Sequence, residues 1–290
     1  MRRAPVLASR RELLATCLAL LAGARTSAAA EGPAFRFGLT PVFLTSDLEL
    51  LTKLQRYLSR QLGQNVELVQ RRTYEEITSL LVSGQIQAAW ICGYPFIAYR
   101  AQLDLVAVPV WRRRPLYQSY LIAKKGRGAS SFQQLKGDVH AFSDPNSNSG
   151  YLVTTALLAE EHLHAADFFR QTFFTYGHRN VVRAVASGLA QSGSVDGYVW
   201  EVMQEIEPSL TSNTEIVRRS EWLGFPPIAC PLALTKSEPV VRLRSALLGM
   251  ASDPDGRDVL SLLRLDGFSQ ELPSLFDGIA AKLSAVRSFG

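Results

Sequence analysis

The sequence predicts an α/β protein of two lobes, each with a mostly parallel sheet covered by helices on both faces. Strand-like and helix-like segments alternate from Phe35 onward, and the alternation restarts after a break at Lys125 to Gly128. The chain is also long enough for two lobes of roughly 100 to 150 residues each. We expect one lobe to interrupt the other, with two hinge crossovers. The expected parts are a first lobe from 31–125 and 219–290 and a second lobe from 126–218.

Residues 1–30 have the pattern of a cleaved export signal. Arg10 and Arg11 precede a short apolar run, and small residues before Ala30 offer an A-x-A cleavage site. The two arginines resemble a twin-arginine signal, and a plain secretory signal is the alternative. The apolar run is too short to span a bilayer. We therefore expect a periplasmic protein whose signal is cleaved near Ala30.

Net charge excludes a nucleic-acid binder once the signal is removed. The whole chain carries a formal charge of +5, from 31 Lys and Arg against 26 Asp and Glu. Five of the basic residues and one acidic residue lie within 1–30, which leaves +1 for the rest. A basic patch of the kind that binds nucleic acid is not expected at that charge.

A strand and a helix open the first lobe. A strand is expected at 35–40, and a helix follows whose leucines, from Leu48 to Leu62, recur at helical spacing. The run from Thr45 to Asp47 offers its N-cap, and Gly63 ends it. The remaining elements expected in this part are strands at 65–70, 88–92, 103–110 and 117–124 and a helix at 74–83.

The second lobe repeats the alternation after Gly128. We expect helices at 132–137, 149–161 and 181–187, and strands at 139–142, 172–176 and 195–199. Residues 215–218 are expected to cross back into the first lobe. Pro226 and Pro227 then lead into a strand at 228–234, and helices are expected at 239–252, 255–263 and 273–286.

The segment from Phe142 to Leu152 is a strand, a small polar loop and a helix start, which is the outline of an anion site. Hydroxyl groups of Ser147 and Ser149 and free backbone N–H groups would converge there, where the helix dipole favours negative charge. The structural alternative is that one of the two serines only caps the helix.

Two further side chains belong to corners that face the same cleft. His178 follows the strand at 172–176, and a histidine there can donate to an anion. Asp196 stands in the next strand, and its carboxylate would repel a dianion. It would favour a protonated oxyanion, or a ligand with an amine. A solvated strand-end carboxylate is the plain alternative for Asp196.

The first lobe contributes two corners, after its first and third strands. Phe43 and Tyr94 are candidates for apolar walls of a pocket, or for core packing. Cys92 ends the third strand beside that pocket, where it is either a soft ligand or a small buried filler. Cys92 and Cys230 are the two cysteines outside the signal, and nothing in the sequence pairs them.

The chain resembles the phosphonate, phosphite and phosphate-type solute-binding proteins of ABC importers, which share the type II periplasmic binding protein fold. The resemblance rests on Asp144-Pro145-x-Ser147-x-Ser149-Gly150-Tyr151, on Gly177-His178, and on Val195-Asp196-Gly197. It implies that the Ser-x-Ser-Gly helix start and His178 hold the oxyanion, that Asp196 helps to orient it, and that Phe43 and Tyr94 are pocket walls. Asn148 stands where phosphonate binders often have Thr.

The resemblance also implies the partners: a small oxyanion ligand and an ABC permease in the inner membrane, with a monomeric binding protein. The same superfamily contains periplasmic arsenite-sensing proteins that use a pocket cysteine and feed a sensor histidine kinase, so Cys92 keeps that alternative open.

An enzyme is not expected. No G-x-S-x-G, P-loop, H-E-x-x-H or G-x-G-x-x-G motif is present, and no zinc-ligand spacing or cofactor motif appears. The remaining enzymatic alternative is a lobe-closing α/β enzyme acting on a phosphorylated compound, with His178 as general base oriented by Asp196.

Overall fold

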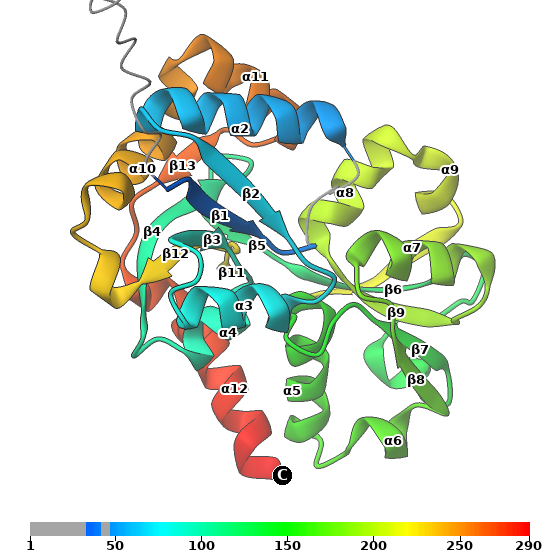
Figure 1. The fold of residues 1–290 in the computed structure, drawn as a ribbon. Coiled ribbons are helices and arrows are strands. Elements are labelled where there is room, and N and C mark those ends of the chain that lie inside the picture. The colour runs from blue at the N-terminus through cyan, green and yellow to red at the C-terminus, as the bar shows by residue number, and fades with distance from the viewer. Residues whose placement is uncertain (1–32, 42–46) are drawn as a thin grey trace, which may run out of the picture. The chain divides into compact units, whose positions relative to one another are not determined.

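The computed structural model describes residues 33–41 and 47–290, and residues 34–290 form one compact unit. Two predictions lie outside the described residues, the cleaved signal at 1–30 and the pocket wall at Phe43. Within the compact unit the strands form two large sheets and one small one (Figure 1). None of the described helices is long and apolar enough to cross a membrane.

The first sheet has six strands in the order β13-β4-β12-β3-β1-β2. Their bounds are β1 Phe35–Leu39, β2 Val66–Gln70, β3 Ala88–Trp90, β4 Leu103–Val110, β12 Ile228–Pro231 and β13 Gly267–Ser269. β1 pairs parallel with β2 and β3, whereas β12 runs antiparallel between β3 and β4. Residues from late in the chain therefore complete a sheet that the first hundred residues begin.

Helices flank this sheet on both faces (Figure 1). They are α2 Leu48–Leu62, α3 Tyr74–Val82, α4 Gly93–Ala98, α10 Glu238–Gly249 and α11 Pro254–Leu263. The last helix, α12 Asp277–Phe289, packs against α4 and against α5 (Val153–Glu160) of the second lobe. Asp47 caps α2 by accepting from the backbone N–H of Leu50 at 3.1 Å, and Gly63 ends it in the left-handed region. Thr73 and Glu76 form a reciprocal capping box that fixes where α3 begins. That start is important because it positions Tyr74.

The second sheet has five strands in the order β10-β6-β9-β7-β8. Their bounds are β6 Ser119–Lys124, β7 Val139–Phe142, β8 Gln171–Phe174, β9 Ser192–Asp196 and β10 Thr214–Arg219. The helices of this lobe are the π-helix η2 Asn148–Leu152, α5 Val153–Glu160, α6 Ala165–Phe168, α7 His178–Ser187, α8 Gly197–Ile206 and α9 Pro208–Thr211. Two sheets, each flanked by helices, confirm the predicted two-lobed α/β class.

The crossovers pair with each other between the two large sheets. β5 (Leu116–Tyr117) and β11 (Leu223–Gly224) form a two-stranded antiparallel sheet. The expected single strand at 117–124 is therefore wrong. The chain leaves β5 at Gln118, whose carbonyl accepts from the N–H of Gly197 at 2.9 Å, before β6 begins. By strand pairing, β6 belongs to the second sheet, so the chain reaches that sheet before residue 126.

Three of the other expected boundaries that differ do so for local reasons. The expected strand at 195–199 ends at Asp196, because that carboxylate caps α8 by accepting from the N–H of Val199 at 3.2 Å. Residues 215–218 belong to β10 instead of forming a bare crossover. β12 ends at Pro231, because a short 3-10 helix follows at Leu232–Leu234.

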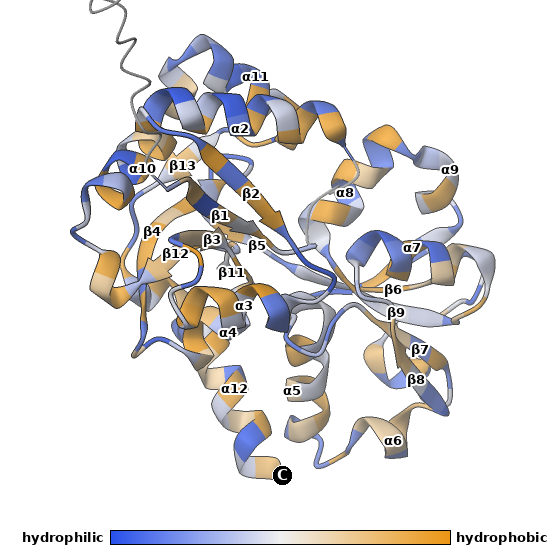
Figure 2. Ribbon diagram, viewed as in Figure 1, coloured by the Kyte–Doolittle hydropathy of each residue, from blue (hydrophilic) through white to orange (hydrophobic). Residues whose placement is uncertain are grey.

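The main apolar core lies along the first sheet and continues into the second lobe through Tyr117, Tyr198 and Phe225. Figure 2 shows hydrophobic colour on β3, β4 and β12 of the first sheet. Trp90 donates from its indole to the carbonyl of Pro226 at 2.9 Å, and so ties β3 to the returning crossover. A second, smaller cluster fills the far side of the second lobe around Phe132 and Phe142.

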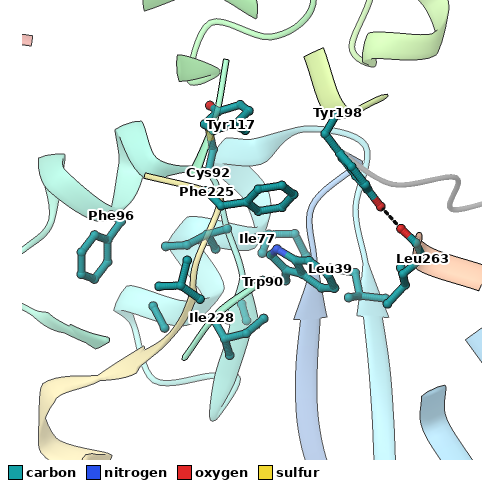
Figure 3. Packing of buried hydrophobic residues seen from close by; sticks show 14 of the residues in the cluster. Leu39, Ile77, Trp90, Cys92, Phe96, Tyr117, Tyr198, Phe225, Ile228 and Leu263 are labelled. Carbon is teal, nitrogen blue, oxygen red and sulfur yellow. Dashed lines mark hydrogen bonds between the residues drawn. The ribbon is translucent and has the colours of Figure 1, made fainter. Parts of the chain in front are cut away.

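Three contacts of α8 join the second lobe to the rest of the chain. The hydroxyl group of Tyr198 donates to the carbonyl of Leu263 at 2.5 Å (Figure 3). Glu205 accepts from Nε of Arg264 at 2.9 Å, and Glu201 pairs with Arg112 in the first crossover at 2.5 Å. The two lobes are thus held in a closed arrangement from the side of α8.

Candidate functional site

The polar loop after β7 is folded tightly and buried. Ser147 caps the helix start, since its hydroxyl oxygen accepts from the N–H of Gly150 at 2.9 Å. The N–H of Ser143 donates to the carbonyl of Gly150 at 3.1 Å, which brings the two ends of the loop together. A Cβ at Gly150 would lie 1.8 Å from Oγ of Ser143 and 3.0 Å from Cε1 of His178. Only glycine permits this approach.

Three side-chain atoms of this loop are buried without a hydrogen-bond partner. They are Oγ of Ser143, Oδ1 of Asn148 and Oγ of Ser149, in residues that are at most 1% exposed. A buried polar group without a partner costs about 1–3 kcal/mol. Their concentration at one helix start is what a site for a polar ligand requires. Ser147, in contrast, takes the capping role considered as its structural alternative.

His178 begins α7 and lies between the two lobes. Its Nδ1 accepts from the backbone N–H of Asp196 at 3.0 Å, and its Nε2 lies 3.2 Å from the hydroxyl group of Tyr74 on α3. Burial lowers the pKa of His178 to about 3, so the ring is neutral. With Nδ1 accepting, the proton is on Nε2 and is donated to Tyr74. The hydroxyl hydrogen of Tyr74 is then available to a ligand.

Asp196 is 1% exposed, which excludes the alternative of a solvated strand-end carboxylate. Burial raises the pKa of Asp196 to about 7, against the hydrogen bonds that it accepts from the start of α8. Its backbone N–H, and not its carboxylate, contacts His178. A general base oriented by a carboxylate would need its Nδ1–H to donate to that carboxylate. The pairing proposed for the enzymatic alternative is therefore not formed.

Asp144 connects the loop to the first lobe. Its Oδ1 accepts from the N–H of Asn146 at 2.8 Å, and its Oδ2 accepts from the N–H of Tyr74 at 3.2 Å. Burial raises the pKa of Asp144 above its ordinary value. The backbone of Tyr74, in the first turn of α3, is thus attached through the Asp144 side chain to the polar loop at 143–150, which we call the serine loop.

The polar residues around the serine loop and His178 form one buried cluster. Its opposite side is formed by Cys92, Asn148 and Tyr117. The backbone N–H of Asn148 donates to Sγ of Cys92 at 3.1 Å, and its Nδ2 donates to the hydroxyl group of Tyr117 at 2.8 Å. Burial raises the pKa of the Cys92 thiol to about 11. Cys92 and Cys230 are both free and buried. Figure 3 shows Cys92 and Tyr117 beside Phe225, whose ring centroid is 5.5 Å from that of Tyr117.

The structure gathers six of the predicted site residues into this buried cluster: Cys92, Ser147, Asn148, Ser149, His178 and Asp196. Tyr94 is the second residue of α4 and is half-buried. Sequence reasoning missed Tyr74, Tyr117 and Ser143. Tyr74 had a usable signal, because the Thr73 capping box marks a third strand-to-helix corner of the first lobe.

The cluster has acidic groups but no cationic side chain. Among the described residues no Lys or Arg is buried, whereas Asp144 and Asp196 are. Among the residues that the structure describes, no group of His, Cys, Asp and Glu is placed so that it could hold a metal ion. Ligand binding here would rest on hydroxyl, amide and imidazole N–H donors and on the helix start.

Comparison with known proteins identifies a family and a curated relative. The family described as "ABC transporter, phosphonate, periplasmic substrate-binding protein" matches residues 37–274. A phosphate-import protein PhnD of Mycolicibacterium smegmatis is 28% identical over 200 residues, which cover 62% of this chain and 62% of that protein. The match thus spans less than two thirds of that relative's length.

Two solved structures have the same fold. The binding protein component of an ABC phosphonate transporter from Pseudomonas aeruginosa has a TM-score of 0.81 at 20% identity, covering 89% of this chain and 87% of that one. PhnD1 from Prochlorococcus marinus, solved with methylphosphonate, has a TM-score of 0.79 at 17% identity, covering 88% and 98%. At these identities the likeness concerns the fold.

Proposed function

The chain belongs to the family of periplasmic substrate-binding proteins of phosphonate ABC transporters, a family of solute-binding proteins and not of enzymes. From this premise we propose that it captures a small phosphonate-like, phosphite-like or phosphate-like oxyanion in the buried cluster between its lobes. The closed protein would then present the ligand to an ABC permease.

One observation carries this proposal: the hydroxyl groups of Ser143 and Ser149 are buried and unpartnered at the start of a helix. An oxyanion offers oxygen acceptors to such donors, and the helix dipole favours its negative charge. The hydroxyl group of Tyr74, already accepting from His178, supplies a further donor from the first lobe. Donors from both lobes explain why binding would favour the closed arrangement.

Calorimetry tests the proposal directly. Purified protein is titrated with phosphate, phosphite, methylphosphonate, aminoethylphosphonate, arsenite and selenite. We expect at least one phosphorus oxyanion to bind and to raise the melting temperature, with no turnover of phosphate esters. Absence of binding by every phosphorus compound would contradict the proposed function.

Two substitutions test the site. Ser149→Ala and His178→Ala each remove a group of the cluster, and we expect both to abolish the ligand-induced thermal shift. Ser284→Ala, on the exposed face of α12, is the matched control and should keep it. Wild-type affinity in Ser149→Ala and His178→Ala would mean that the ligand binds elsewhere.

An arsenite sensor acting through Cys92 has less support. Trivalent arsenic binds thiolates, and the raised pKa keeps this thiol protonated at neutral pH. β12 runs antiparallel to β3, with Ile228 opposite Trp90 and Ala229 opposite Ala89, so Cys230 lies toward the other end of β3. A second thiol is therefore not at hand. Loss of arsenite binding in Cys92→Ser, together with weak binding of phosphorus oxyanions, would revive that role.

We also propose that the chain acts as a periplasmic monomer that serves a permease and not a sensor kinase. Light scattering of the purified protein would measure the mass with and without ligand. Deleting the protein should abolish cellular uptake of the compound that calorimetry identifies. Unchanged uptake would contradict the transport role.

A further inference from the structure

The cluster contains a hydrogen-bond acceptor that an anion cannot satisfy. Oδ1 of Asn148 is fully buried and has no partner, while Nδ2 of the same amide donates to Tyr117. A fully ionised oxyanion presents only acceptor oxygens. It would therefore leave this amide oxygen unpaired in the closed site, at a cost of about 1–3 kcal/mol. A ligand with a hydroxyl group would donate to it.

The charges around the site also disfavour a fully ionised ligand. Asp144 is buried in the cluster, and so is Asp196, which adds its own negative charge above a pH of about 7. No described Lys or Arg is buried anywhere to offset them. His178 cannot supply a positive charge while its Nδ1 accepts from a backbone N–H. Partial charges at helix starts are the remaining electropositive feature, and each amounts to roughly half an elementary charge. A second negative charge on the ligand is poorly compensated here.

Resting on the proposed function, we propose that the site selects oxyacids that keep at least one hydrogen on an oxygen when bound, and that Asn148 is the residue that recognises this hydroxyl group. Monoprotonated phosphite and methylphosphonate fit this class. Sulfate and the dianions of phosphite and methylphosphonate do not. Hydrogen phosphate keeps one hydroxyl group as a dianion, so its affinity should be intermediate between those of the two groups.

The test measures the affinity of the wild-type protein for phosphite, methylphosphonate, phosphate and sulfate from mildly acidic to mildly alkaline pH. Affinity for phosphite and methylphosphonate should fall about tenfold per pH unit above each ligand's own second pKa. Phosphite loses its second proton at lower pH than methylphosphonate, so its affinity should begin to fall first. Sulfate should bind at least about tenfold more weakly than monoprotonated phosphite.

Groups of the protein also titrate in this pH range. Comparing phosphite with methylphosphonate shows whether the ligand or the protein causes the pH dependence of affinity. The titratable groups in the cluster are Tyr74, Cys92, Tyr117, Asp144, His178 and Asp196. If one of them governed the pH dependence, both affinities would fall at the same pH. That result would overturn the proposal, as would sulfate binding as tightly as phosphite.

A variant assigns the effect to Asn148. Asn148→Leu has a similar size without the acceptor, and the ratio of phosphite to sulfate affinity should fall about tenfold. Asn146→Leu in the same loop is the control and should keep the ratio. An unchanged ratio in a folded Asn148→Leu protein would overturn the assignment. If no compound binds the wild type, the proposed function fails as well; if all four bind equally, this inference alone fails.

Discussion

Replacing Gly150 by alanine tests the packing of the serine loop most directly. The new methyl group would lie 1.8 Å from Oγ and 2.6 Å from Cβ of Ser143, and 3.0 Å from Cε1 of His178. The hydroxyl group can rotate away, but the Cβ atom is fixed to the end of β7. It must move about 0.8 Å to reach the 3.4 Å of ordinary contact. Overpacking of this kind costs about 1–3 kcal/mol.

We therefore expect Gly150→Ala to lower the free energy of unfolding by about 1–3 kcal/mol and to abolish oxyanion binding, since Ser143 and His178 both move. Urea denaturation measures the first effect and calorimetry the second. Gly249→Ala is the matched control, because its methyl group would meet nothing within 4 Å at the end of α10. That variant should be as stable as the wild type or slightly more stable.

A double variant identifies the cause. Ser143→Gly removes both atoms that the new methyl group meets most closely, so Ser143→Gly with Gly150→Ala should be more stable than the sum of the two single effects predicts. A Gly150→Ala protein within about 0.5 kcal/mol of the wild type that still binds ligand would refute the reasoning, because surface substitutions have effects of that size.

Three further outcomes are expected. Tyr74→Phe should weaken oxyanion binding about tenfold to a hundredfold by calorimetry, because it removes a donor to a charged ligand; unchanged affinity would exclude that contact. Asp196→Asn should gain stability relative to the wild type as pH rises, by about 1.4 kcal/mol per unit, between the ordinary carboxyl pKa and about 7. The reason is that the Asp196 carboxyl group loses its proton in that pH range in the unfolded wild-type chain but keeps it in the native chain. If the difference in unfolding free energy between variant and wild type does not change with pH, the carboxyl group is ionised in the folded protein. Glu205→Arg should lower ligand affinity by less than about fivefold and enlarge the radius of gyration in X-ray scattering, because the Glu205–Arg264 ion pair joins the lobes at an exposed site. Adding Arg264→Glu should reverse both effects. No recovery in the double variant would exclude the ion pair as their cause.

Much of the fold was predictable, because it depends on local patterns. The leucine spacing from Leu48 to Leu62, with Asp47 before it and Gly63 after it, gave the correct bounds of α2. β4 and β7 were also correct. Each is a short apolar run bounded by polar residues or turns.

The errors occurred where one particular contact, either long-range or local, decides where an element ends. The break at Gln118 depends on pairing between two crossovers about a hundred residues apart in sequence. The end of β9 depends on whether the carboxylate of Asp196 points along the strand or caps the next helix, and both are compatible with the sequence. The strand at 228–234 was expected three residues too long for a similar local reason.

Only part of the site was predictable, because some of its residues follow a local pattern and others do not. Ser147, Asn148 and Ser149 occupy one loop with a recognisable pattern, so their position at a helix start could be expected. Tyr74 and Tyr117 come from other elements, and only the closed arrangement of the lobes brings their hydroxyl groups to His178 and Asn148. No spacing along the chain encodes such a meeting.

The position of β12 between β3 and β4 has a consequence for biosynthesis. The first sheet cannot be assembled before residue 231 has left the ribosome, and until then β3 and β4 both present unpaired edges. The second lobe, whose strands β6 to β10 are continuous in sequence, is free to form earlier. A growing chain therefore passes through a stage with a complete second lobe beside a half-built first lobe. The ligand cannot be captured at that stage, and any export route that carries folded protein must wait for the end of synthesis.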